Sequence, residues 1–167
     1  MSKTVCIVCT GNTCRSPMAE GLLRKLLREA GAEGVKVFSA GTRAADGLNA
    51  AYESQQAMRG YGVSLRGHRS AQLTREAIKR ADVILTMEAG HIAEVLDLDG
   101  TAAGKTHTLK GFAAGVRGIP GADCDVRDPY SLPLDAYLAC AKEILEHLKR
   151  ALPLLLKELG IPKKPEK

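Results

Sequence analysis

Residues Val5–Pro17 read VCIVCTGNTCRSP and combine an apolar run, a glycine-containing loop and the start of a helix. The apolar run predicts a buried β-strand. Ser16 and Pro17 stand where a helix usually has its N-terminal cap and its first residue, so we expect a helix to begin there. A strand that turns through a short loop into a helix is typical of proteins in which helices connect parallel strands.

The remaining sequence continues this alternation of strands and helices. Strands are expected at residues 4–8, 35–39, 83–87 and 106–109, and helices at residues 17–30, 49–61, 74–80, 88–98 and 134–159. Pro153 is expected to kink or split the last helix. Residues 110–133 are rich in glycine, proline and aspartate and predict a long irregular loop, which in a small domain usually has a function. The pattern predicts an α/β fold whose parallel sheet is covered on both faces and binds ligands at the carboxyl ends of its strands.

Length and composition are those of one ordinary globular domain. The chain has 167 residues, and we expect a single domain over residues 1–160 followed by a short flexible tail over residues 161–167. Without an apolar run of about 20 residues or a signal-peptide pattern, the expected location is the cytoplasm, with no membrane contact. A net charge of +5 with 4% aromatic residues and no tryptophan does not suggest a nucleic-acid-binding protein. Such a mild positive charge could attract acidic, phosphorylated substrates, or it could simply belong to a soluble basic surface.

The chain contains five cysteines, three of them within the first fourteen residues: Cys6, Cys9, Cys14, Cys124 and Cys140. Without a secretion signal they do not suggest a disulfide scaffold. Cys6 and Cys9 have the spacing of half a zinc site, but no second such pair and no paired histidines complete it. We therefore expect no metal and no other cofactor.

The loop between the first predicted strand and helix has the features of a phosphate-binding site. Backbone N–H groups at a helix start, together with the helix dipole, can point at one anion. The residues expected to bind phosphate are Thr10, Gly11, Asn12, Thr13, Cys14, Arg15 and Ser16. Gly11 is expected to let the backbone approach closely or take a positive φ, and the planar guanidinium of Arg15 can grip two phosphate oxygens. The same positive field favours a thiolate at Cys9, which could attack phosphorus in line.

Each assignment in this loop has a simpler alternative. Cys9 would otherwise be a small buried side chain after a strand, Arg15 a solvated arginine and Ser16 an ordinary helix cap. In the catalytic interpretation Ser16 donates a hydrogen bond to the sulfur, and Asn12 holds the loop. The strand before the loop and the helix start after it favour the catalytic interpretation of Cys-x5-Arg.

A phosphatase that works through cysteine also needs a general acid for the leaving group. Asp128 is the best candidate because Pro129 biases it to an extended conformation on the loop at residues 110–133, which could close over the phosphate site. Asp125 is a rival acid or a residue that holds the loop. Tyr130 would line the wall of the substrate site, or would only pack.

In four segments the sequence resembles the low-molecular-weight protein tyrosine phosphatase family. The segments are Cys9–Pro17, Ser39–Thr42, His68–Ser70 with Leu73, and Asp125–Tyr130, and Asp82–Met87 with His91 resembles a further one. The resemblance implies a doubly wound α/β fold, a three-layer sandwich around a central four-stranded parallel sheet. It also implies metal-free hydrolysis through phosphocysteine. Phosphorylated proteins are the expected partners, and the expected oligomeric state is a monomer.

The resemblance assigns roles to individual residues. Cys9 would be the nucleophile, Arg15 the phosphate clamp and Asp128 the general acid and base. Four residues would hold the loop by hydrogen bonds: Asn12, Ser16, Ser39 and His68. His91 has no assigned role.

The substrate preference is open between two classes. Thr13 stands in the middle of the loop, where the tyrosine-specific members commonly carry an aliphatic residue, and the whole loop resembles the bacterial protein arginine phosphatase branch. A threonine hydroxyl beside phosphorus could orient the polar guanidinium of phosphoarginine or the attacking water. Thr13 and Tyr130 are therefore the candidate specificity residues, with phosphoarginine favoured and phosphotyrosine the alternative.

Two further hypotheses concern the cysteines. Cys14 lies five residues from Cys9 across the loop, so a Cys9–Cys14 disulfide could switch activity off under peroxide. A thiol-dependent arsenate reductase shares this loop, but only Cys124 and Cys140 could relay a disulfide outward. A non-enzymatic phosphoprotein reader is disfavoured, because such a module needs neither the nucleophile nor the acid.

Overall fold

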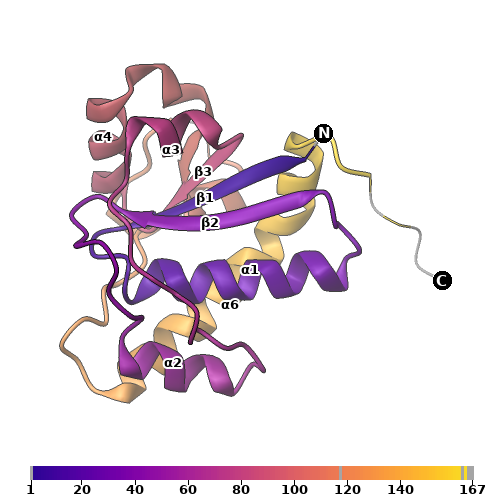
Figure 1. The fold of residues 1–167 in the computed structure, drawn as a ribbon. Coiled ribbons are helices and arrows are strands. Elements are labelled where there is room, and N and C mark those ends of the chain that lie inside the picture. Colours follow the sequence, from indigo (N-terminus) through magenta and orange to yellow (C-terminus); the bar gives the residue numbers. More distant parts are fainter. Residues whose placement is uncertain (1, 117, 163, 165–167) are drawn as a thin grey trace.

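The computed structural model describes residues 2–116, 118–162 and 164, and it is built around a four-stranded, entirely parallel sheet (Figure 1). The strands are β1 (Lys3–Cys9), β2 (Val35–Gly41), β3 (Val83–Thr86) and β4 (Thr106–Thr108), in the spatial order β2-β1-β3-β4. β1 therefore lies inside the sheet, between β2 and β3. Its residue Cys9 is level with Gly41 at the carboxyl edge of the sheet.

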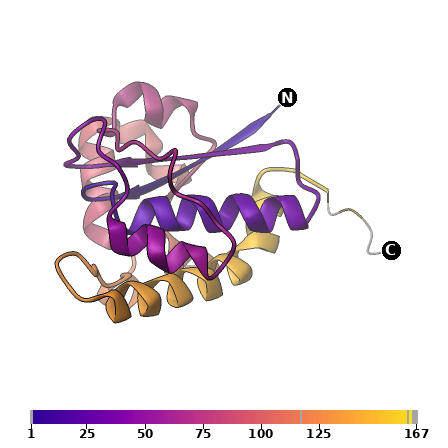
Figure 2. The same ribbon diagram turned by 60° about the horizontal axis from the view of Figure 1, so that its bottom comes forward.

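Helices cover both faces of the sheet, as the sequence predicts. They are α1 (Arg15–Glu29), α2 (Tyr52–Arg59), α3 (Arg75–Arg80), α4 (Ala89–Leu98), α5 (Leu109–Ala113) and α6 (Leu134–Glu158), with 3₁₀ turns η1 (Gly100–Lys105) and η2 (Ala122–Cys124). Val5 and Ile7 pack in the core under α1 and α6, whereas Cys6 and Val8 pack in a second core under α3 and α4. Figure 2 shows α1, α2 and α6 together on one side of the sheet. The three-layer, doubly wound sandwich with four parallel strands is confirmed.

Several boundaries differ from the sequence expectations for local physical reasons. α1 begins at Arg15, with Cys14 as its cap, so Ser16 is already the second helical residue and the expectation of Ser16 as cap is wrong. α2 begins at Tyr52 rather than at Asn49. β4 ends at Thr108, and Leu109, which was expected in that strand, begins α5. Thr108 caps α5 by accepting a hydrogen bond from Gly111 N at 3.0 Å, so the predicted loop at 110–133 contains the rest of α5 and also η2.

α6 continues through Pro153 without a break. Proline removes the hydrogen bond to the carbonyl of Lys149, but Lys149 is exposed, so water can take the missing donor's place. Ala151, Leu155 and Leu156 meanwhile remain buried against the core. No helix of the described residues is long and apolar enough to cross a bilayer. The predicted tail at 161–167 lies partly outside the described residues.

Candidate active site

The loop from Thr10 to Cys14 joins β1 to α1 at the carboxyl edge of the sheet and is held from outside through its carbonyl groups. Four of its carbonyl oxygens accept hydrogen bonds from donors beyond the loop: Arg43 N to Thr10 O (3.0 Å), His68 Nε2 to Asn12 O (2.7 Å), Ala51 N to Thr13 O (2.8 Å) and Ser54 Oγ to Cys14 O (3.4 Å). The carbonyl oxygen of Cys9, just before the loop, accepts from Thr42 N at 2.9 Å. Among the described residues, no acceptor pairs with the backbone amides of residues 10–14. The loop therefore keeps its N–H groups available for an anion, as the helix-start argument predicts.

Cys9 lies at the end of β1 with 2% of its surface exposed, and its sulfur is 2.9 Å from the hydroxyl oxygen of Ser16. The same oxygen accepts a hydrogen bond from Asn12 Nδ2 at 2.8 Å, which leaves the hydroxyl proton of Ser16 for the sulfur. Ser16 can therefore donate a hydrogen bond to the sulfur of Cys9. Cys6 packs on the opposite face of the sheet, so these two cysteines do not converge as zinc ligands would.

Asn12 is fully buried and has a φ of 56°, in the left-handed region that asparagine tolerates better than most residues. Its Nδ2 donates to Ser16 and, at 2.9 Å, to Ser39 Oγ, and its Oδ1 accepts from Ala71 N at 2.9 Å. With the bond from His68 to its carbonyl, Asn12 ties the loop to three separate segments. The structure thus brings together the four residues that the family resemblance implies for loop support.

His68 acts through a defined tautomer. Its Nε2 contacts a carbonyl oxygen, so Nε2 carries the proton. Burial lowers the pKa of His68, which keeps the ring neutral at neutral pH. Its Nδ1 faces Glu20 at 4.0 Å, and burial raises the pKa of Glu20.

Arg15 is 1% exposed, so the alternative of a solvated arginine is wrong. Its Nη1 donates to Val126 O at 2.8 Å and lies 3.3 Å from Glu88 Oε1, and its Nη2 lies 3.4 Å from Asp128 Oδ2. These partners fix the plane of the guanidinium at the mouth of the loop. Glu88 was not among the expected site residues, although its position two residues after the end of β3 puts it at the carboxyl edge where ligands bind.

The structure gives the two candidate acids different surroundings. Asp125 Oδ1 accepts a hydrogen bond from Ala89 N at 2.7 Å and so ties its loop to the start of α4. The side chain of Asp128 is 44% exposed, and its Oδ1 accepts from Tyr130 N at 3.1 Å, which leaves Oδ2 facing Arg15. Tyr130 is 70% exposed, so the alternative that it only packs is wrong.

His91 has a contact that the sequence did not suggest. Its Nδ1 accepts from Glu88 N at 3.1 Å, so Nε2 carries the proton and can donate to Thr10 Oγ1 at 2.9 Å. Burial, followed by the charge of Arg15, lowers the pKa of His91 to about 4, so this ring is also neutral. His91 therefore holds the first residue of the loop from the α4 side.

The glycine requirement falls at a different position from the expected one. Gly11 does not have a positive φ, and a Cβ there would touch only Thr13 Oγ1, at 3.8 Å. A Cβ on Gly41 would overlap the carbonyl oxygen of Thr10 and lie 3.0 Å from Asn12 N. The close backbone approach is thus made by the end of β2, against the loop.

Thr13 and Cys14 form the other side of the loop. Thr13 is half-buried, with its hydroxyl 3.7 Å from the sulfur of Cys14. Cys14 is buried and lies 3.6 Å from the hydroxyl of Tyr137, and burial raises the pKa of its thiol. Both Cys9 and Cys14 are free thiols here.

Comparison with known proteins identifies the class to which this arrangement belongs. The family model described as "Low molecular weight phosphotyrosine protein phosphatase" matches residues 4–164. The chain belongs to this family of cysteine-dependent protein phosphatases.

Individual relatives carry two kinds of name. The protein-arginine-phosphatase of Geobacillus stearothermophilus is 38% identical over 86% of this chain and 90% of its own length. The low molecular weight protein-tyrosine-phosphatase Etp of Escherichia coli K12 is 40% identical over 80% of this chain and 82% of its own. Among solved structures, YwlE arginine phosphatase from G. stearothermophilus has a TM-score of 0.82 at 35% identity and covers 98% of this chain and 99% of its own. A YwlE mutant with a phosphorylated active-site serine in place of cysteine has a TM-score of 0.80 at 35% identity, and the match covers 92% of this chain and 95% of the mutant's chain.

Proposed function

We propose that this protein dephosphorylates protein side chains through a phosphocysteine on Cys9. The observation that carries the proposal is the 2.9 Å contact between Cys9 and Ser16, inside a loop whose amides are free and whose edge holds the buried Arg15. The phosphorylated serine in the YwlE mutant supports a covalent intermediate at the position of the nucleophile.

The proposed reaction has two steps. The sulfur of Cys9 attacks phosphorus while the bond from phosphorus to the substrate oxygen or nitrogen breaks, and Asp128 gives its proton to that leaving atom. Water then attacks the phosphocysteine, Asp128 takes a proton from the water, and the S–P bond breaks with its electron pair returning to sulfur. The hydroxyl of Ser16 stabilises the thiolate at both ends of this cycle.

Arg15 would bind the equatorial phosphate oxygens together with the loop amides. Val126 and Glu88 hold its Nη1, which leaves Nε for phosphate. Nη2 pairs with Asp128 in this structure, and a bound phosphate oxygen would take the place of that carboxylate on Nη2, which releases Asp128 to act as the acid. A test is Cys9→Ser, which should abolish hydrolysis of an aryl phosphate yet still bind inorganic phosphate. Residual turnover above that of a buffer blank would contradict the role of Cys9.

For the substrate we propose phosphoarginine, with phosphotyrosine as the second candidate. Two observations support the first: Thr13, a half-buried residue of the loop, carries a hydroxyl, and two relatives, from G. stearothermophilus and Bacillus subtilis, are protein-arginine-phosphatases. The relative Etp supports the second. The test is the ratio of kcat/KM for phosphoarginine and phosphotyrosine peptides.

Thr13→Ile should lower that ratio by about tenfold, the scale of one lost hydrogen bond, whereas Thr13→Ser should preserve it. An unchanged ratio in Thr13→Ile would refute the role of Thr13. Tyr130 is exposed and its backbone N–H donates a hydrogen bond to Asp128, so its ring would contact the substrate side chain.

We also propose that peroxide inactivates the enzyme reversibly. Peroxide would oxidise the Cys9 thiolate to a sulfenic acid, and the thiol of Cys14 would displace water from it to form a disulfide. Dithiothreitol should restore activity in the wild type but not in Cys14→Ser, with Cys140→Ser as the control. Recovery in Cys14→Ser equal to that of the wild type would exclude this disulfide.

The broader proposal is a monomeric cytoplasmic enzyme, with its domain at 1–160 and a short tail, that acts without nucleic acid, membrane or metal. An arsenate reductase relay through Cys140 is disfavoured, because burial raises the pKa of that thiol to about 12 and it would rarely be a thiolate.

A further inference from the structure

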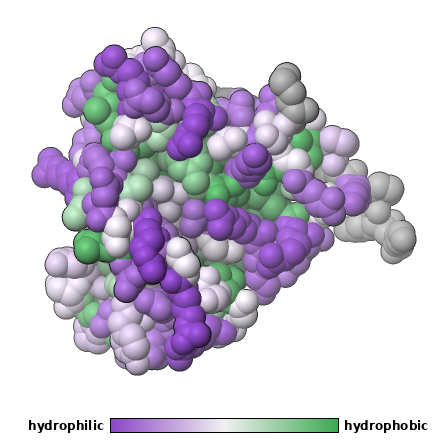
Figure 3. Space-filling view, in the orientation of Figure 1, coloured by the Kyte–Doolittle hydropathy of each residue, from purple (hydrophilic) through white to green (hydrophobic). Residues whose placement is uncertain are grey.

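Three cavities that share lining residues adjoin one another beside β2, α1 and residues 62–69, and we call them together the basic trough. The central cavity, of about 610 Å³, shares residues 62–65 with a second of about 420 Å³ and shares Arg24, Arg28 and Phe38 with a third of about 770 Å³. Figure 3 views this face and shows hydrophilic side chains bordering a more hydrophobic strip. Because each volume alone would suit one small ligand, the trough as a whole suits a longer occupant.

The charge of the trough is strongly one-sided. Its lining contains seven cationic residues: Arg24, Arg28, Lys36, Arg59, Arg66, Arg69 and Arg80. Glu20 is the one carboxylate among the lining residues that the structure describes, whereas the whole chain has 24 lysines and arginines against 19 acidic residues. Such a concentration of positive charge attracts an acidic partner.

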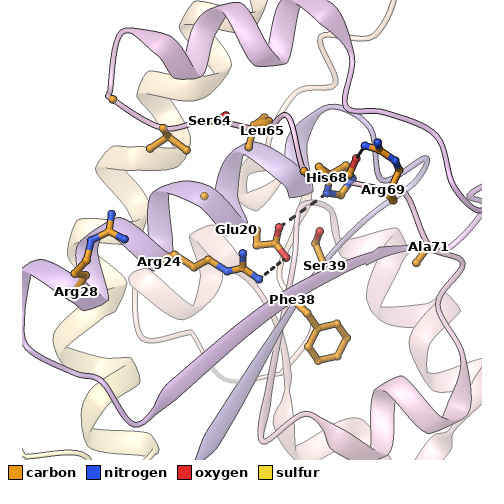
Figure 4. A pocket seen from close by; sticks show the side chains of 14 residues that line it. Glu20, Arg24, Arg28, Phe38, Ser39, Ser64, Leu65, His68, Arg69 and Ala71 are labelled. Atoms are coloured by element: carbon orange, nitrogen blue, oxygen red, sulfur yellow. Dashed lines mark hydrogen bonds and ion pairs between the residues drawn. The ribbon is translucent and has the colours of Figure 1, made fainter.

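Glu20 does not cancel this charge at the surface. It lies between Arg24, at 3.4 Å, and His68, at 4.0 Å, and its side chain is mostly buried (Figure 4). Four of the cations have side chains without a hydrogen-bond or ion-pair partner among the described residues: Arg28, Lys36, Arg59 and Arg66. All four are exposed, so a bound carboxylate could reach them without breaking an internal bond.

The shape and the aromatic content favour polypeptide over nucleic acid. Residues 35–39 of β2 line two of the three cavities, so this part of the trough follows a strand for about 16 Å, which matches about five residues of an extended peptide. The aromatic ring in its lining, Phe38, is covered by the guanidinium of Arg80 at 5.0 Å from the ring centre. A covered ring offers no platform for a base.

The trough also adjoins the catalytic loop. Ser39 and His68 line its central cavity, and both hold Asn12 of the loop by hydrogen bonds. A segment bound in the central cavity would therefore lie next to two residues that hold the catalytic loop.

We propose that the basic trough docks an extended acidic segment of the phosphorylated proteins on which this enzyme acts. This rests on the proposed action on phosphorylated proteins, but the docking itself needs neither phosphate nor turnover. Docking would raise the local concentration of the phosphorylated residue and lower KM without changing the chemical step.

The direct test is binding of a fluorescent, unphosphorylated peptide rich in aspartate and glutamate, measured by anisotropy. The trough variant combines Arg28→Glu, Lys36→Glu and Arg66→Glu. The control variant reverses three exposed charges on α6, by Lys142→Glu, Lys149→Glu and Arg150→Glu. Both variants have the same net charge, so a difference between them in binding of the acidic peptide depends on where the changed charges lie.

We expect the wild type and the control to bind the acidic peptide at least tenfold more tightly than an Asn/Gln analogue. The trough variant should lose that preference, and inorganic phosphate should not compete. Equal loss in the control, or competition by inorganic phosphate, would overturn the proposal. So would tighter binding of a single-stranded oligonucleotide of equal charge, or displacement by tripolyphosphate at equal affinity, because these results indicate a nucleic-acid site or a small-anion site.

A kinetic measurement separates this proposal from the catalytic one. In the trough variant, KM for a phosphopeptide with an acidic flank should rise about tenfold, while its kcat and the hydrolysis of an aryl phosphate stay at wild-type values. An unchanged KM would refute docking and leave the catalytic proposal intact. Loss of aryl phosphate hydrolysis in Cys9→Ser tests the catalysis alone.

Discussion

Replacing Asn12 by alanine should show how much the hydrogen bonds that hold the catalytic loop contribute to the free energy of unfolding. The Asn12 side chain makes three hydrogen bonds, with Ser16, Ser39 and Ala71 N, in a fully buried site. At about 1 kcal/mol for each bond, their loss costs about 3 kcal/mol. Alanine at a φ of 56° adds about 1 kcal/mol of backbone strain. We expect Asn12→Ala to lower the free energy of unfolding by about 4 kcal/mol.

Two further variants divide this total. Asn12→Gly loses the same bonds without the strain, so it should be about 1 kcal/mol more stable than Asn12→Ala. Ser131 has a similar φ of 61° but is exposed, so Ser131→Ala should cost about 1 kcal/mol at most.

The assay is urea unfolding at neutral pH, together with kcat for an aryl phosphate. A loss below about 1 kcal/mol in Asn12→Ala would refute the argument that these buried bonds hold the loop. So would full activity in that variant.

Three other perturbations test separate parts of the site. Asp128→Asn should lower kcat by about 10²–10⁴-fold, whereas Asp125→Asn should mainly lower the melting temperature; the reverse pattern in paired kinetic and melting experiments would exchange their roles. His91 has a pKa of about 4 when folded and about 6.5 when unfolded, so the unfolded state binds the extra proton first. The free energy of unfolding should therefore fall by about 3 kcal/mol as the pH drops from 6.5 towards 4, and His91→Gln should flatten that part of a urea titration over pH; an unaltered slope would count against it. Gly41→Ala should destabilise the protein by about 1–3 kcal/mol through the overlap with Thr10, while Gly11→Ala should leave the melting temperature nearly unchanged; equal shifts would be inconsistent with the observed backbone contact.

The sheet and its helices could be predicted because local patterns and packing agree. The apolar runs at β1 and β3 are buried on both faces, and continuous apolar runs of this length are typical of parallel strands. The amphipathic pattern of α6 likewise predicts one long helix, and this helix continues through Pro153. Boundaries were less predictable where a few contacts decide them, as at α5, which rests on one cap by Thr108.

The catalytic loop was predictable because its chemistry is contiguous in sequence. Its supports are not: Glu88 and His91 come from the β3–α4 junction, and the sequence alone gave no distance between them and Arg15 or Thr10. Their signal was only their place after a strand end. The sequence around Gly41 does not indicate that glycine is needed there, because the need arises only when the loop that follows β1 approaches the end of β2.

The basic trough was also invisible in the sequence. Its cations are scattered between Arg24 and Arg80, and the net charge of +5 gives no sign that they converge. Folding α1 against β2 and residues 62–69 brings them to one side.

The most direct measurement is mass spectrometry of Asp128→Asn quenched during turnover of a phosphorylated substrate, since slow hydrolysis should let the intermediate accumulate. We expect one phosphoryl group, bound through sulfur to Cys9 and absent from Cys9→Ala/Asp128→Asn. Phosphate on another residue, or no adduct while turnover continues, would contradict covalent catalysis by Cys9.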